Sequence, residues 1–325
     1  MDSFMRQVFF IIFFIFSPLF SQEAIHVIII DKDDIGKKGI PFMITNRIDL
    51  HVHSTCSDGT FTPEELVLEA KKSGVCAFAL TDHDTCLGVL KAADAAAREN
   101  IELIPGIELS TDFHGKEVHI VGLYIDPQNP LLLEKTAEYK NCRENRNARM
   151  VEALQNEGLA ITMDALLAEN PDCVITRANI ARFLYEHGCV KSVREAFDRY
   201  IGDHSKCYIG RFKVASAEAI QLIHEAGGIA ILAHPLLYKL GKSALQSMVS
   251  ELKEAGLDGL EAIYSTYSVS EEQQMKKLAA DNHLAISGGS DFHGTNKPDI
   301  HLGSGRGHLY VPYSVLEYLK TLHQV

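Results

Sequence analysis

The first residues that could do chemistry lie in an alternating stretch at positions 48–59. Apolar residues at 48, 50 and 52 alternate with polar ones, which is typical of a strand. Side chains alternate faces along a strand, so His51 and His53 point the same way. Asp58 follows in a loop that contains a glycine. Imidazole and carboxylate groups on one face suit zinc, manganese or iron, although a single His-x-His pair is weak support by itself.

Other predicted strands end in groups of the same kind. In parallel α/β folds the carboxyl ends of the strands meet at one rim, so we expect six strands to bring ligands together. The competing interpretations are a core histidine for His234, a turn cap for Asp291 and a structural role for His119. Chance would rarely put so many histidines and carboxylates at one rim, so a metal centre is favoured. We expect Asp82 and Asp84 to orient His83 as a ligand. Besides His51, His53 and Asp58, the candidate ligands of this metal centre are His83, Glu108, His119, His234, Asp291 and His293.

A repeating strand–helix pattern supplies the scaffold for these groups. The predicted strands are 48–53, 76–81, 101–107, 117–124, 229–233, 258–263 and 284–289. The predicted helices between and after them are 63–73, 87–99, 217–226, 243–255, 271–281 and 313–323, with a capping box at Ser270 and Gln273 for the fifth. Seven strands, each mostly followed by a helix, predict an α/β fold with a parallel sheet closed into a barrel.

The pattern divides the chain into three parts. The barrel is expected from 43–127 and 216–325. A helical insertion is expected over 128–215, with helices at 131–158, 162–168, 178–187 and 193–200 and no strand before Tyr208. Residues 1–42 form an apolar N-terminal extension that does not resemble the rest.

The extension has two interpretations. Its apolar run at 8–20 is too short to span a bilayer and has the size of a signal-peptide core, which would mean export or anchoring. Alternatively, Met43 is the true start. Seven scattered cysteines without a Cys-x-x-Cys motif favour Met43 and a cytoplasmic location, with no stable membrane association of the 43–325 part.

Charge limits the class of partner. The chain has 31 Lys and Arg against 43 Asp and Glu, a formal net charge of −12, which argues against a groove for long duplex nucleic acid. A small anionic substrate stays compatible, because clustered divalent cations would reverse the local field.

The predicted strands end in a set of short motifs. These are Asp49-Leu50-His51-Val52-His53-Ser54, Ser57-Asp58-Gly59, Leu80-Thr81-Asp82-His83-Asp84, Pro105-Gly106-Ile107-Glu108, Ala233-His234-Pro235 and Ser290-Asp291-Phe292-His293. They resemble the motifs of the PHP (polymerase and histidinol phosphatase) family. The resemblance covers about 43 to 325 and is strongest to the stand-alone subgroup of 3′,5′-nucleoside bisphosphate phosphatases and 5′–3′ exoribonucleases that act on short RNA.

The resemblance implies a distorted (β/α)7 barrel with a trinuclear site. Three divalent metal ions are expected, with manganese, zinc, iron and magnesium all open as their identity. Glu108 would bridge two of them. By resemblance the sets are His51, His53, Glu108 and Asp291 for the first ion, Glu108, His119 and His234 for the second, and Asp58, His83 and His293 for the third.

The expected reaction is hydrolysis of phosphate esters of nucleotides or short 5′-phosphorylated RNA. A hydroxide bridging two metals would attack in line, and the third metal would help to hold the phosphate. Arg177 and Asp84 are the candidate catalytic residues, and Arg177, Arg211 and Lys206 are the candidates for binding phosphate. One departure matters: the subgroup often has Arg-Pro-His where this chain has Arg177-Ala178-Asn179, so the exact substrate stays open.

Three other functions remain as alternatives. A small monoester such as histidinol phosphate would use the same site, although the helical insertion favours nucleotides. Amidohydrolases also place a His-x-His strand in a barrel, but they usually need a carboxylated lysine or an equivalent bridge, and no lysine ends a predicted strand here. A non-catalytic metal-binding module is disfavoured because no expected ligand is missing.

Overall fold

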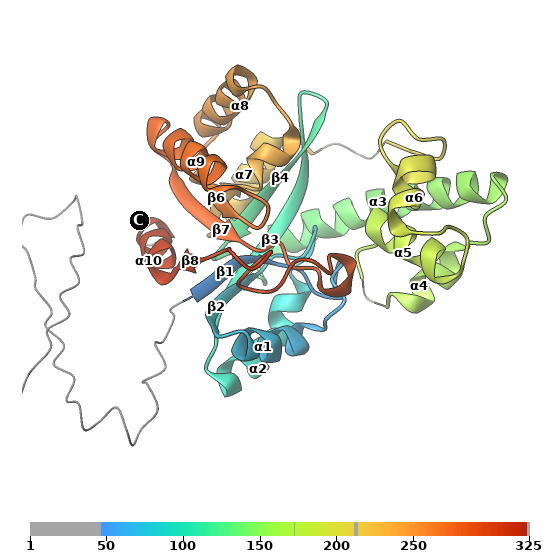
Figure 1. The fold of residues 1–325 in the computed structure, drawn as a ribbon, viewed down its shortest axis with the longest axis horizontal. Coiled ribbons are helices and arrows are strands. Elements are labelled where there is room, and N and C mark those ends of the chain that lie inside the picture. Colours follow the sequence, from blue (N-terminus) through green and yellow to red (C-terminus); the bar gives the residue numbers. More distant parts are fainter. Residues whose placement is uncertain (1–46, 172, 211–213, 324–325) are drawn as a thin grey trace, which may run out of the picture. The chain divides into compact units, whose positions relative to one another are not determined.

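The computed structural model describes residues 47–171, 173–210 and 214–323 (Figure 1). The expected extension at 1–42 and the phosphate-binding candidate Arg211 lie outside these described residues. Residues Thr45–Val325 form one compact unit. Within the described residues, no helix has both the length and the apolar character needed to cross a membrane.

All seven predicted strands are present, and a two-residue strand joins them. The strands are β1 (Arg47–Val52), β2 (Val75–Leu80), β3 (Glu102–Phe113), β4 (Lys116–Leu123), β5 (Ile229–Leu232), β6 (Gly259–Tyr264), β7 (Ala285–Gly289) and β8 (Val311–Pro312). Their order in the sheet is β7-β6-β5-β4-β3-β2-β1-β8. The chain after β7 returns to β1, where the Asp291 N–H donates to the His51 carbonyl at 2.9 Å and the His53 N–H to the Phe292 carbonyl at 3.0 Å. The sheet therefore closes nearly into the expected barrel.

Six helices surround this barrel (Figure 1). They are α1 (Pro63–Lys72), α2 (Leu87–Glu99), α7 (Ser216–Glu225), α8 (Lys242–Glu254), α9 (Val269–Asp281) and α10 (Tyr313–His323). The predicted start of α9 was wrong, because its capping box is formed by Ser268 and Glu271. The carboxylate of Glu271 suits the positive end of a helix better than the amide of Gln273 does.

The sheet is not wholly parallel, which corrects the expectation from the sequence. β4 runs antiparallel to both β3 and β5. β3 and β4 are joined by a tight turn at His114 and Gly115, whose φ values are 50° and 90°. Two residues can join only antiparallel neighbours, whereas a parallel crossover needs a dozen or more. His119 therefore lies in the first half of β4 and not at the carboxyl end of a strand.

An apolar core inside the barrel supports the site. Side chains from strands all round the sheet meet in one cluster, which Leu316 and Leu319 of α10 join. Glu108 pairs with Val121 across β3 and β4, and residues that pair directly share a face. Since Val121 belongs to the inner cluster, Glu108 points into the barrel as well.

The helices between residues 130 and 201 have a core of their own. They are α3 (Pro130–Asn156), α4 (Met163–Glu169), α5 (Arg177–Glu186), α6 (Val193–Ala196) and the π-helix η1 (Phe197–Ile201). In α3, Leu132 and Tyr139 pack with barrel residues, whereas Met150 and Leu154 pack in the insertion core. One continuous helix thus ties the insertion to the barrel. The division into barrel (43–127 and 216–325) and insertion (128–215) stays a proposal.

Candidate metal centre

The structure brings the nine predicted metal ligands together. In each of four overlapping groups, the ligand atoms lie within 4.8 Å of one another. Seven of the nine residues are buried, and His83 and His119 are partly exposed. The groups are His53, Asp58, His83 and His293; His51, Glu108 and His234; His51, His53 and Asp291; and His83, Glu108 and His119.

Glu108 lies at the centre of this arrangement. Its Oε2 is 3.3 Å from His51 Nε2, 3.3 Å from His53 Nε2 and 3.0 Å from His83 Nδ1. Its Oε1 is 2.9 Å from His119 Nδ1 and 3.2 Å from His234 Nε2. One carboxylate therefore faces five imidazoles, which is the position that a bridging ligand requires.

The grouping differs from the one that the resemblance implied. His119 groups with His83 and Glu108, whereas the resemblance paired it with His234. His53 belongs both to the Asp291 group and to the Asp58 group. The sequence could not show this sharing, because it depends on which way each ring turns.

Unpaired polar atoms test whether the cluster fits cations. His51 Nε2, His53 Nε2, His83 Nδ1 and Asp58 Oδ1 are buried and lack a hydrogen-bond partner. Polar atoms buried in this way are costly unless something binds them. Nitrogen and carboxylate oxygen are also the ligands that transition metals prefer. The donor set therefore fits divalent cations.

The electrostatics of the cluster keep its carboxylates ionised. Burial would raise the pKa of Glu108, but the imidazoles of His83 and His51 hold it well below the usual value. Burial lowers the pKa of His83 to about 3, so this ring stays neutral. Burial would also lower the pKa of His53, but the carboxylates of Asp291 and Glu108, each 3.3 Å from its Nε2, raise it to about 9. The ionised carboxylates and the neutral His83 ring are in the forms that bind metals, whereas a cation would have to displace the proton of His53.

Glu261 is a supporting residue that the sequence analysis missed. This buried side chain of β6 places Oε1 2.8 Å from His51 Nδ1 and accepts the backbone N–H of His234 at 2.7 Å through Oε2. A carboxylate behind a metal-binding histidine orients the ring and fixes its tautomer. An acidic residue within the apolar strand at 259–264 is the signal that could have revealed it.

Asp291 is held from behind in a similar way. Tyr264 Oη donates to Asp291 Oδ2 at 2.6 Å, and Lys297 Nζ lies 2.5 Å from the same oxygen. Its Oδ1 is left facing His53 Nε2 at 3.3 Å. The sequence analysis missed both Tyr264 and Lys297.

The two aspartates that flank His83 have other partners. Asp82 accepts hydrogen bonds from the backbone and hydroxyl of Ser54 and from the hydroxyl of Ser57, so it holds the loop after β1. Asp84 accepts the Ser110 N–H at 2.9 Å and forms a buried ion pair with Arg143. We therefore propose a positioning role for Asp84 in place of the predicted catalytic one.

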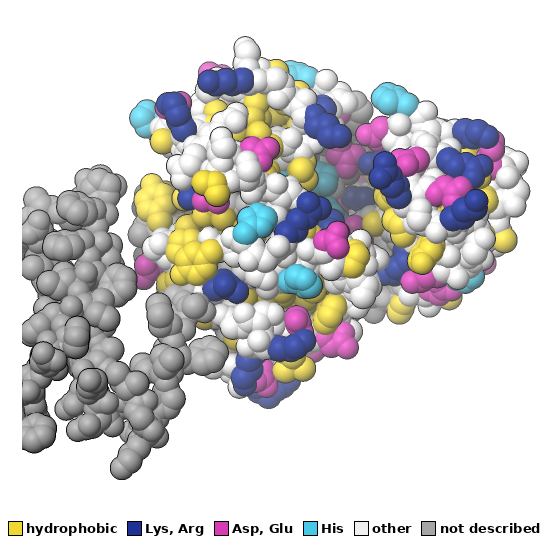
Figure 2. Space-filling view, in the orientation of Figure 1, with side chains coloured by type: hydrophobic (Ala, Val, Ile, Leu, Met, Phe, Trp, Pro, Cys, Tyr) yellow, Lys and Arg dark blue, Asp and Glu magenta, His cyan; other side chains and the backbone are white. Residues whose placement is uncertain are grey.

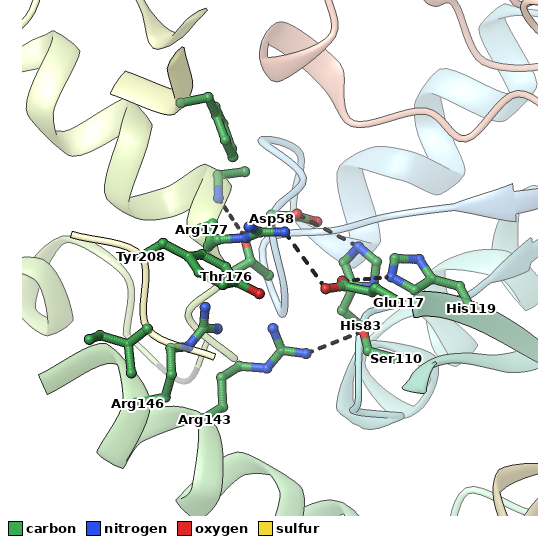
Figure 3. A pocket seen from close by; sticks show the side chains of 13 residues that line it. Asp58, His83, Ser110, Glu117, His119, Arg143, Arg146, Thr176, Arg177 and Tyr208 are labelled. Carbon is green, nitrogen blue, oxygen red and sulfur yellow. Dashed lines mark hydrogen bonds and ion pairs between the residues drawn. The ribbon is translucent and has the colours of Figure 1, made fainter. Parts of the chain in front are cut away.

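A cavity of about 160 Å³ lies beside the cluster (Figure 3). Its barrel side carries His83, His119 and Glu117, and its insertion side carries three arginines, Arg143, Arg146 and Arg177. Arg177 lies 5.4 Å from the ring of Tyr208 and pairs with Asp203 at 2.7 Å and Glu117 at 3.7 Å.

The three arginines on the insertion side of the cavity, called the arginine wall below, are not the same set of described residues as the predicted phosphate-binding residues. Arg177 was predicted, whereas Arg143 and Arg146 were missed. Their spacing of three residues on a long helix puts them on one face, which is the signal that could have found them. Lys206 pairs with Glu157 at 2.8 Å and is not among the cavity-lining residues, so its role stays an untested prediction.

Comparisons with known proteins identify the family. Residues 49–202 match the PHP domain. A 5′–3′ exoribonuclease from Haemophilus influenzae is 38% identical over 250 residues, which span 77% of this chain and 91% of the relative. The chain belongs to the PHP domain family. Another PHP relative, a 3′,5′-nucleoside bisphosphate phosphatase from Chromobacterium violaceum, is 36% identical over 250 residues, 76% of this chain and 87% of the relative.

Solved structures agree with the PHP fold. An amidohydrolase from Chromobacterium violaceum with bound sulfate superposes with a TM-score of 0.76 at 32% identity, covering 85% of this chain and 96% of that one. A protein described as a metal-dependent phosphoesterase from Bifidobacterium adolescentis gives 0.75 at 30% identity, covering 84% and 95%. The predicted fold class and the predicted reaction class, metal-dependent hydrolysis of phosphoric esters, are confirmed.

Proposed function

We propose that this PHP protein hydrolyses phosphate esters of nucleotides or of short RNA that carries a 5′-phosphate. The observation that carries the proposal is the cavity between the ligand cluster and the three arginines. A substrate that fits must offer one phosphate to the cluster and further negative charge to Arg143, Arg146 and Arg177. Nucleoside bisphosphates and 5′-phosphorylated RNA ends have this chemistry. The relative from Chromobacterium violaceum is named for 3′,5′-nucleoside bisphosphates, and the one from Haemophilus influenzae is named as a 5′–3′ exoribonuclease.

The nine clustered side chains would hold the cations, and we propose three ions. When bound, such ions would neutralise phosphoryl oxygens and lower the pKa of water to about 7. The protein's own part is to hold the ligands in place, through Glu261 behind His51 and through Tyr264 and Lys297 behind Asp291. The identity of the ions, whether manganese, zinc, iron or magnesium, is part of the test below.

The insertion would bind the rest of the substrate. An arginine offers a planar pair of donors that matches two phosphate oxygens. A cavity of about 160 Å³ is too small to enclose a double helix. On the face drawn in Figure 2, charges of both signs are interspersed over the described residues, and the net charge is −12. These features favour a short single-stranded or mononucleotide substrate over long duplex nucleic acid.

Product analysis tests this proposal. The purified protein is incubated separately with a 3′,5′-bisphosphate, a short 5′-phosphorylated RNA, histidinol phosphate and a cyclic amide, each with Mn²⁺, Mg²⁺ or Zn²⁺. We expect inorganic phosphate from the bisphosphate or mononucleotides from the RNA. Turnover of histidinol phosphate alone would support the small-monoester alternative, and turnover of the cyclic amide alone would support the amidohydrolase alternative.

A substitution in the arginine wall separates binding from chemistry. Arg177→Ala should raise KM for a nucleotide substrate by about tenfold, which corresponds to about 1.4 kcal/mol of lost binding, with a smaller change in kcat. Arg194→Ala is the matched control, because Arg194 is an exposed insertion arginine that pairs with Asp198. If KM and kcat are the same for the two variants, Arg177 does not contribute to substrate binding.

The location proposed for the protein is the cytoplasm. All seven cysteines lie in the described part of the chain and are free thiols there. Free thiols at so many positions are typical of a reducing compartment. Cell fractionation, together with N-terminal sequencing of the native protein, distinguishes this location from export.

A further inference from the structure

A short segment of the insertion docks on the loop that carries Asp58. The Val174 N–H donates to the Cys56 carbonyl at 2.9 Å, and Asn179 Nδ2 donates to the Ser57 carbonyl at 3.2 Å. Cys173, Val174 and Asn179 are buried. The loop that presents Asp58 is therefore shaped partly by the insertion and not by the barrel alone.

Thr176 contacts the side chain of the candidate metal ligand Asp58 directly. Its Oγ1 lies 3.1 Å from Asp58 Oδ2 and 2.9 Å from Asn179 Oδ1. Thr176 and Asp58 are both drawn in Figure 3. A hydroxyl has one proton to donate. Asn179 Oδ1 also accepts the Thr176 N–H at 2.7 Å, so its acceptor capacity is already partly used, whereas Asp58 Oδ2 belongs to an ionised carboxylate. A hydrogen bond to an ionised group is the stronger of the two.

The geometry leaves the other oxygen of Asp58 for the cluster. Asp58 Oδ1 lies 3.2 Å from His293 Nε2 and 3.9 Å from His53 Nδ1, and it lacks a hydrogen bond. With Oδ2 fixed by Thr176, the carboxylate cannot rotate freely about its terminal bond. Oδ1 is therefore kept pointing at the neighbouring imidazoles.

We infer that Thr176 is a positioning residue for the cation held by Asp58, His83 and His293, so that the insertion sets how tightly this cation binds. The inference rests on the proposed function, since it concerns the same site. Thr176 is the N-cap of α5, and the next residue is Arg177 of the cavity wall. Two consecutive residues at the start of α5 thus have different tasks: Thr176 supports the cation ligand Asp58, and Arg177 faces the proposed substrate site.

Metal retention tests the inference without relying on turnover. The full-length protein and its variants are loaded with Mn²⁺ and dialysed against graded concentrations of a chelator, and Mn²⁺ per chain is counted. Thr176→Val should lose one ion at a chelator concentration about tenfold lower than the wild type does, which is the lower end of the effect of removing a partner behind a metal ligand. Thr176→Ser should behave like the wild type.

Two further variants separate this effect from loss of a helix cap. Thr162 is the exposed N-cap of α4, also in the insertion, and its side chain accepts the Ala165 N–H at 3.1 Å. Thr162→Val therefore removes a cap without touching the cluster and should retain Mn²⁺ as the wild type does. Thr176→Gly removes the hydroxyl at little cost to the cap, so it gives the same readout if Thr176→Val folds poorly.

Each outcome has one meaning. If Thr176→Val and Thr176→Gly retain Mn²⁺ like Thr162→Val while the wild type binds it, the inference about Thr176 is overturned and the proposed function stands. If the wild type binds no Mn²⁺, Mg²⁺ or Zn²⁺, the proposed function and the inference both fall.

Discussion

At the scale of single residues, the centre depends on carboxylates that each serve several partners. Glu108 faces five imidazoles, and Glu261 holds the ring of His51 and the backbone of His234. Ionised carboxylates in such a buried position need compensation, which the imidazoles provide here and cations would strengthen. Removing one of these groups should therefore affect the whole cluster.

The simplest residue-level prediction concerns two candidate ligands. His53→Ala or Asp291→Asn should reduce kcat on a phosphoester substrate by at least about a thousandfold, because each removes a ligand that the cations would share. Circular dichroism should show an unchanged fold, because the barrel core does not include these side chains. Near-native turnover by either variant would contradict the assignment.

Glu261 allows a second residue-level prediction. Glu261→Gln keeps the volume of the side chain, but its amide cannot accept both the His51 ring N–H and the His234 backbone N–H. We expect the affinity for Mn²⁺ to fall about 10- to 100-fold, as for other partners behind metal ligands. Titration calorimetry measures this. Glu251→Gln is the control, because Glu251 is exposed and pairs with His114. The same affinity in both variants would argue against a role for Glu261.

At the scale of elements, the β3–β4 hairpin and helix α3 do the positioning. The hairpin puts Glu108 and His119 on the same face of adjacent strands, because Glu108 pairs with Val121 and His119 pairs with Ser110. Arg143 lies on α3 between the part of the helix that packs on the barrel and the part that packs in the insertion core. Its side chain pairs with Asp84, which follows β2. The insertion is thus fixed to the barrel by a buried charge pair as well as by apolar packing.

Breaking this pair gives a prediction about stability. Arg143→Met removes the guanidinium that compensates the buried charge of Asp84 and should lower the free energy of unfolding by about 3 kcal/mol. The double variant Asp84→Asn, Arg143→Met should recover part of the loss, because no unpaired charge remains. Urea unfolding measures both. An unchanged midpoint for Arg143→Met would show that the pair does not stabilise the fold.

The contact between α7 and the residue that precedes β6 gives a pH-dependent prediction. A hydrogen bond with Asp258, 2.7 Å from His224 Nε2, raises the pKa of His224 above its usual 6.5. Because the folded-state pKa is the higher one, the stabilisation is complete below pH 6.5 and is lost as the pH rises through the folded-state pKa. The side chain is partly exposed, so screening reduces the effect to about 0.5 kcal/mol.

Comparing the wild type with His224→Gln checks this sign. Urea midpoints should differ more at about pH 5.5 than at about pH 8.5, because the protonated imidazole is lost as the pH rises through its raised pKa. A difference that is the same at both values would mean that protonation of His224 does not contribute.

At the scale of the whole molecule, cations should stabilise the fold as well as serve the reaction. A cation that binds only the folded state, present at about a hundred times its Kd, contributes about 2.7 kcal/mol. Removing cations with a chelator should therefore lower Tm, and adding Mn²⁺ back should restore it. Thermal melts of the full-length protein measure the change. A Tm that is the same with and without cations would count against binding at the cluster.

The sequence by itself determined the family, the seven long strands and the nine candidate ligands. Each of these depends on local patterns: alternation along β1, apolar runs in the other strands, and ligand types near the strands. It did not determine the direction of β4, because the strand pattern is the same whichever way the strand runs.

Only the tertiary structure decided which groups support the ligands. Glu261 lies 210 positions from His51, and Thr176 lies 118 positions from Asp58. Contacts over such separations depend on how the barrel closes and on where α3 places the insertion. Local patterns do not encode that geometry, because packing and chain closure act on the whole unit at once.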